Sequence, residues 1–155
     1  MTASMSEKMR GLMFTTSPAQ LKLTPLPSGL WAGMMEFEVS GTWVTLLAIL
    51  DGTTSLYFGS GGGIIGAGGH AAVREAAQTF LESMDKASTG FVKVAAYPLP
   101  GQGHVHFYTL KADGVYASPD IDEAELTKPG HPLLPLYAAA QNLITQIRLA
   151  DQRGK

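Results

Sequence analysis

Seven glycines fall within residues 59–69, and this run is the clearest candidate for a ligand-binding site in the sequence. A strand pattern precedes the run and a helix pattern follows it. Backbone N–H groups of a glycine loop before a helix can bind an anion. A crowded strand-to-helix corner also requires glycines, so a ligand site and a structural loop both stay open. The candidate ligand-binding residues are Gly61, Gly62, Gly63, Gly66, Gly68, Gly69 and His70.

Two established phosphate-binding motifs fit this run poorly. Residues 61–66 match the spacing G-x-G-x-x-G, but in a dinucleotide-binding fold the helix opens inside that motif. Here the helix pattern starts only near His70, and the acids at the expected distance, Glu82 and Asp85, lie on the helix itself. No lysine follows the glycines, as a P-loop requires. A looser anion nest at residues 66–69 remains, with His70 expected in a local capping role.

His104 and His106 form the second candidate site. On a strand, residues two apart point to the same face, so both imidazoles could bind one metal ion. A third ligand would have to come from the fold. The candidates for it are His70, His131, Asp113 and Asp120. Two imidazoles without a positioned third ligand make a weak site, so we expect an ordinary strand with no metal and no cofactor.

The sequence contains no recognisable nucleophile site. Ser60 lies between two glycines, but a nucleophile elbow needs G-x-S-x-G, and Phe58 occupies the first glycine position. We therefore expect no catalytic residues and a non-enzymatic role.

Composition narrows the class of protein. The chain has 155 residues, with 45% hydrophobic and only 15% charged residues, so part of its surface is expected to face a partner. The net charge of −2 and the lack of a basic run argue against nucleic acid. Cysteine is absent, which is compatible with a cytoplasmic location. No apolar stretch is long enough for a membrane span or a signal peptide.

Turn signals divide the chain into an N-terminal arm, residues 1–29, and one α/β domain, residues 30–155. Within the arm, residues 6–14 favour helical turns and residues 20–23 a short edge strand.

Hydrophobic periodicity in the domain predicts three strands, a helix, three strands and a helix. The expected strands are 35–39, 43–50, 55–58, 91–97, 104–111 and 115–117, and the helices start near residues 71 and 134. Glu36 and Glu38 alternate with apolar residues, which predicts a half-exposed first strand. The fold class is α/β (α+β type): a single, mainly antiparallel sheet of five to six strands with two main helices, in the order βββαβββα.

The strand at 44–50, the turn Asp51-Gly52, the strand at 53–58, the glycine loop and the helix from about Ala71 resemble the core of roadblock and longin-type domains, which belong to the profilin-like α/β group. The resemblance covers the element order of residues 34–150. It implies a non-enzymatic scaffold or regulator that dimerises, and it supplies no catalytic residues.

These observations predict a small cytoplasmic scaffold or regulatory protein that acts through protein–protein association. Strand 43–50 is apolar on both faces, and two helices cover only one face, so we expect the other to be buried in a homodimer. The alternative is a small-molecule, phosphate or nucleotide-binding protein, or an enzyme, that uses the loop at 59–69. We expect neither nucleic acid nor membrane as a partner.

Overall fold

The centre of the structure, a computed structural model that describes residues 5–65 and 69–153, is one antiparallel sheet. Its strands are β1 (Leu30–Val39), β2 (Thr42–Ile49), β3 (Thr54–Phe58), β4 (Gly63–Ile65), β5 (Val92–Val94), β6 (His104–Lys111), β7 (Gly114–Ala117) and β8 (Ile121–Asp122). Seven strands follow the order β4-β3-β2-β1-β6-β7-β5, and β8 pairs with β6. The long strands β1, β2 and β6 therefore lie in the middle.

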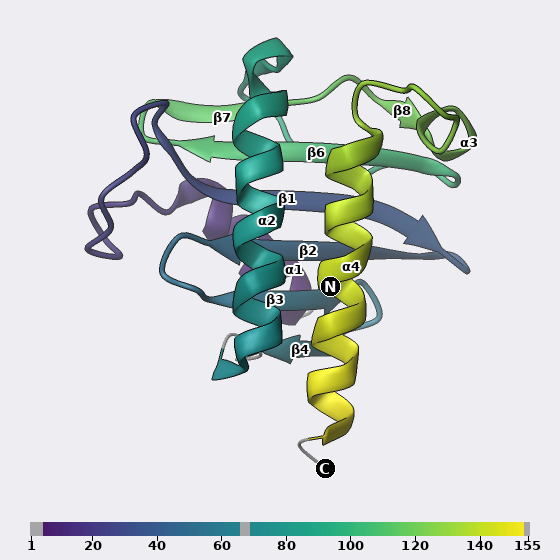
Figure 1. Cartoon of the computed structure of the whole chain (residues 1–155), viewed down its shortest axis with the longest axis horizontal. Helices are drawn as coiled ribbons and strands as arrows, with labels where there is room; N and C mark the ends of the chain where they lie inside the picture. Colours follow the sequence, from purple (N-terminus) through teal and green to yellow (C-terminus); the bar gives the residue numbers. More distant parts are fainter. Residues whose placement is uncertain (1–4, 66–68, 154–155) are drawn as a thin grey trace.

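The helices divide between the two faces of this sheet. They are α1 (Met5–Thr15), α2 (Ala71–Ala87) with the 3₁₀ turn η2 (Ser88–Gly90), α3 (Glu123–Leu126) and α4 (Leu134–Arg153). The two long helices, α2 and α4, lie side by side across one face, and α1 lies behind the sheet (Figure 1). None of the helices in the described part of the chain combines the length and the apolar character needed to cross a bilayer.

The predicted mixed class with an antiparallel sheet is confirmed, but the predicted five to six strands and the order βββαβββα are wrong. In the described part of the chain, α1 precedes β1, a fourth strand precedes α2, and β8 and α3 precede α4. Sequence periodicity missed β4, because it is three residues long and lies inside the glycine run. It also missed β8, a two-residue strand in a polar connector. The strand expected at 91–97 shortens to β5, and the edge strand expected at 20–23 is a series of turns. Such short segments carry too few residues for a period to be recognised.

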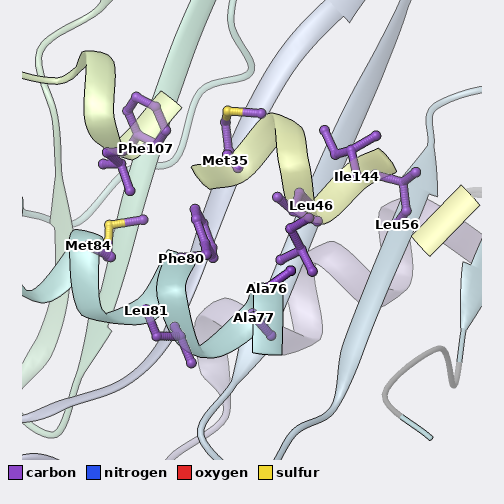
Figure 2. Close-up of a cluster of buried hydrophobic side chains, with 14 of the residues drawn as sticks. Met35, Leu46, Leu56, Ala76, Ala77, Phe80, Leu81, Met84, Phe107 and Ile144 are labelled. Carbon is purple, nitrogen blue, oxygen red and sulfur yellow. The ribbon is translucent and has the colours of Figure 1, made fainter. Parts of the chain in front are cut away.

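The face under α2 and α4 holds the larger hydrophobic core. The buried side of α2 is the stripe that 3–4 spacing predicts: Val73, Ala76, Ala77, Phe80, Leu81 and Met84. Phe80 lies among side chains from the sheet and from α4, with Met35 and Leu46 on one side and Ile144 beyond them (Figure 2). Gly33 in β1 lets α2 come close, because a Cβ there would lie 3.3 Å from both Leu81 Cδ2 and Met84 Cε.

The opposite face holds a second core, which α1 covers. Its buried members are Met13, Phe14, Trp31, Ala32, Met34, Leu47, Ile49, Tyr57, Tyr108, Leu110 and Val115. Strand β2 is thus apolar on both faces and covered on both, as its sequence predicts. The cover on the second face comes from the chain's own N-terminal arm, so burying β2 does not require a second copy.

Candidate functional site

The most unusual feature of the α1-covered face is a buried ion pair at the centre of the sheet. Glu36 in β1 is fully buried, although its alternation with apolar residues predicts a half-exposed position. Arg10 of α1 donates from Nε to Glu36 Oε2 at 2.6 Å and from Nη2 to Oε1 at 2.7 Å. A bidentate pair of this kind is stronger and more selective in geometry than a single hydrogen bond. The expectation for Glu36 was wrong because α1 folds over it.

Strand register surrounds Glu36 with polar neighbours. It lies opposite Thr45 of β2 and His106 of β6, and Thr45 lies opposite Tyr57 of β3. Residues directly opposite one another in antiparallel strands share a face. The Thr45 hydroxyl donates a hydrogen bond to Glu36 Oε2. The carboxylate therefore has a partner for each oxygen in a place where an unpaired charge would be very costly.

The segment between β5 and β6 forms a wall beside this ion pair. The carbonyl oxygen of Tyr97 accepts from Arg10 Nη2 at 2.7 Å. The carbonyl of Pro98 accepts from the Tyr108 hydroxyl at 2.9 Å and lies 3.0 Å from His106 Nδ1. The backbone at residues 97–98 is thus bound both to α1 and to β6.

A cluster of aromatic rings lies beside the Arg10 guanidinium. Its Cζ lies 4.9 Å from the centre of the Phe14 ring, within the range of a cation–π contact. Phe14 stacks on Tyr97, with ring centres 4.2 Å apart, and meets Tyr108 edge-on at 5.1 Å. A carboxylate, a carbonyl and aromatic rings together form a site that suits a guanidinium group.

The two predicted metal candidates, His104 and His106, lie on β6 beside this wall. His106 Nε2 is 2.6 Å from Asp120 Oδ1, and His104 Nδ1 is 2.7 Å from Asp120 Oδ2. Despite this short distance, His104 Nδ1 has no hydrogen-bond partner with suitable geometry. Both ring nitrogens of His106 face oxygen acceptors, so both contacts are hydrogen bonds only when the ring carries two N–H groups.

We predict that protein purified without chelator or affinity resin contains no stoichiometric zinc, nickel or iron. The two imidazoles contact different oxygens of one carboxylate and do not converge on a common point. Over residues 5–65 and 69–153, no group of three or more histidine, cysteine, aspartate or glutamate side chains is placed to hold a metal ion. Elemental analysis is the measurement. Near-stoichiometric metal that disappears in Asp120→Ala would contradict the prediction.

Burial raises the pKa of Tyr108 to about 12, with a further contribution from the negative charge of Glu36. A tyrosine whose folded pKa is raised stabilises the fold below pH 10, and this contribution is lost as the pH rises toward 12. We expect the wild type to lose about 2 kcal/mol more unfolding free energy than Tyr108→Phe between pH 9 and pH 12. Urea unfolding of both proteins across this range is the test, and parallel curves would contradict it.

The glycine run lies at the β4 edge of the sheet, and β4 divides it. Residues 59–62 form the turn of the β3–β4 hairpin, in which Phe58 N donates to the Gly62 carbonyl at 2.9 Å, and Gly63 begins β4. Gly66 and Gly68 fall outside the described residues. Gly69 and His70 are exposed just before α2, and the His70 side chain makes no capping hydrogen bond. Strands β3, β2 and β1 separate β4 from the histidine pair on β6.

We expect Gly59→Ala to lower the unfolding free energy by about 1–3 kcal/mol, because the added Cβ would lie 2.5 Å from Trp43 Nε1. Gly62→Ala is the matched control: a Cβ there meets nothing within 4 Å, and its φ lies outside the left-handed range. Thermal unfolding of the two variants checks this. Equal melting temperatures for the two variants would show that the Trp43 side chain shifts without loss of stability.

The sequence identified His104 and His106 but missed Arg10, Glu36 and Tyr97. One signal was available: Arg10, Met13 and Phe14 are three and four residues apart on a helix, which puts a cation on an apolar stripe. Nothing in the sequence pairs that cation with Glu36, 26 positions later. A scan of protein-family models, a search of curated proteins and a search of solved structures gave no match to this chain.

Proposed function

We propose that this protein is a small scaffold or regulatory protein that acts through association, and that it binds a protein helix on the sheet face now covered by α1. The observation that carries this proposal is the Arg10 guanidinium held by the buried carboxylate of Glu36. Association through a helix is consistent with the resemblance to roadblock and longin-type domains, which stays a prediction.

The way α1 sits on the sheet supports this proposal. Its anchors, Arg10, Met13 and Phe14, follow the i, i+3, i+4 spacing by which an amphipathic helix lies in a binding surface. Leu12, on the outward side, is 55% exposed. Arginine and aromatic side chains in desolvated surroundings are the residues that most often dominate the energy of an interface.

A labelled peptide of residues 5–18 is the probe for this surface. We expect it to bind the full chain carrying Arg10→Glu, because that substitution sets two carboxylates against each other and weakens the hold on the chain's own α1. Fluorescence anisotropy measures the binding. A peptide with Arg10→Ala should bind at least about tenfold more weakly, since it lacks the charged hydrogen bonds to Glu36.

The peptide with Leu12→Ala is the matched control, because Leu12 points outward, and it should bind like the unmodified peptide. Circular dichroism establishes that the Arg10→Glu chain is folded. A folded Arg10→Glu chain that binds none of the peptides, or equal losses for the two substituted peptides, would refute the proposal.

A cavity of about 400 Å³ favours a second candidate function, small-molecule binding. It lies between the β2–β3 turn and α2, with Leu26, Leu50 and Leu81 among its apolar lining and Arg74 and Glu82 among its charged lining. Its size suits a small ligand. The hairpin turn at 59–62 does not line this cavity.

Ligand screening by NMR tests this second candidate. A true ligand should shift the methyl signals of Leu50 and Leu81 and leave those of Leu149 unchanged, because Leu149 is 44% exposed on α4 and does not line the cavity. Leu81→Phe should fill the space and abolish the shift of the Leu50 methyl signals, which remain observable in this variant.

A further inference from the structure

The N-terminal segment that covers Glu36 is joined to the sheet by a connection with few ties of its own. Residues 16–29 contain neither helix nor strand. For residues 16–25, the backbone hydrogen bonds recorded in the structure join partners at most five positions apart. Leu26 and Gly29 are tied to the domain, through the Leu30 carbonyl and the amide of Ala112 respectively. Between the buried Pro18 and this anchored part, Leu23 is partly buried and packs against the α1-covered core, and residues 19–25 can act as a hinge when that contact opens.

This hinge contains a residue in an unfavourable backbone conformation. Lys22 has a φ of 57°, in the left-handed region that side-chain-bearing residues seldom adopt. The backbone turns at this point, with Lys22 N donating to the Ala19 carbonyl at 3.1 Å and Leu23 N to the Pro18 carbonyl at 2.9 Å. If the hinge opens, Lys22 can return to an ordinary conformation, and strained hinges of this kind favour exchange of segments between copies.

The contacts that hold α1 are made by side chains that a second copy would supply equally well. Arg10 binds Glu36, Phe14 stacks on Tyr97, and Met13 belongs to the buried cluster. A pocket of about 120 Å³, open to solvent, lies beside Met13 and Phe14 at the end of α1.

The sheet face cannot remain open when α1 leaves it. Removing α1 would expose a buried carboxylate at Glu36 together with Trp31 and Tyr108, which are 1% and 2% exposed in the folded chain. Large apolar side chains around an unpaired charge require a cover. The segment whose charge and shape fit this face is α1 itself, from the same chain or from a second copy.

We propose that two copies of this chain exchange their N-terminal segments, each α1 covering the sheet of the other copy, in a closed two-fold dimer. This inference rests on the proposed function, because it names the partner helix as the α1 of a second copy. Arg10 of one copy then pairs with Glu36 of the other. Reciprocal exchange covers the Glu36-bearing sheet face of each copy, so no uncovered face remains to bind a third copy. Opened out, the seven-residue hinge can span up to about 25 Å.

A pair of charge-reversed chains tests the exchange. Arg10→Glu places two carboxylates together within its own chain, and Glu36→Arg places two guanidinium groups together. In a mixed dimer with exchanged segments, both ion pairs are restored. Native Arg10 meets native Glu36 on one sheet, and the two substituted side chains meet with reversed charges on the other. Mixing the two variants, one carrying a mass tag, should give a 1:1 complex by native mass spectrometry and light scattering.

Each variant alone should not form this complex. The double variant Arg10→Glu with Glu36→Arg is the control: its charges match within one chain and between copies alike, so it should exchange segments to the same extent as the wild type. If Glu36→Arg is unfolded alone, the partner chain should restore its circular dichroism signal.

Tagged and untagged wild-type copies give a second readout without charge reversal: after incubation together at high concentration, mixed dimers should appear. Absence of mixed dimers in both experiments would overturn the proposal.

Hinge variants add a graded measure. Lys22→Gly relieves the left-handed conformation in the closed monomer and should lower the dimer fraction, whereas the β-branched Lys22→Thr should raise it. Equal dimer fractions for the two Lys22 variants would contradict the role of the hinge.

The peptide experiment separates the two proposals. Peptide binding without mixed dimers supports the association function and refutes segment exchange. If neither peptide binding nor mixed dimers are observed, both proposals are refuted.

Discussion

Replacing Arg10 with Met is expected to lower the free energy of unfolding by about 3–5 kcal/mol, because it leaves the Glu36 carboxylate buried without its cation. Glu36→Met should cost less. Arg10 is 14% exposed and keeps the Tyr97 carbonyl as a partner, so its charge can still reach water. Urea unfolding at micromolar concentration, where exchange between copies contributes least, is the measurement.

The double variant Arg10→Met with Glu36→Met is the control for this prediction. Two apolar side chains of similar volume should recover most of the loss, since neither charge is then left unpaired. If the loss of unfolding free energy in the double variant equals the sum of the two single losses, the two side chains act independently. The ion pair would then contribute nothing specific to the position of α1.

Replacing Phe80 with Ala is the second large effect, with an expected loss of about 3–5 kcal/mol. Phe80 is fully buried at the centre of the core between α2 and the sheet, and the surrounding side chains come from several elements and cannot all move into the space (Figure 2). Denaturant unfolding measures the change in stability.

Thr79→Ala is the control for Phe80→Ala, because Thr79 is the preceding residue on α2, is exposed, and donates from its hydroxyl to the Glu75 carbonyl. We expect it to change stability by no more than about 0.5 kcal/mol. A loss for Phe80→Ala as small as this would show that the core closes around the missing ring. The peptide experiment would then need a new interpretation as well, since a core so compliant could also reshape the α1 face.

Long elements were predictable because their periodicity is strong. The apolar stripe on α2 and the buried positions Leu136, Ala140, Leu143 and Ile147 of α4 follow directly from 3–4 spacing. The central hairpin follows from the nearly continuous apolar run at 43–50 and from the turn at Asp51, where Gly52 has a φ of +96°. These signals are local, so they survive without knowledge of the fold.

The sequence by itself determined an antiparallel sheet with two long helices, the two-sided burial of β2 and the shared face of His104 and His106. Tertiary structure alone decided that Arg10 meets Glu36, and that Asp120 joins the histidine pair. Which distant segment covers a sheet face depends on chain path and register, which local periodicity does not encode. A buried carboxylate and an exposed one therefore have the same alternating pattern, and only a partner from elsewhere in the chain distinguishes them.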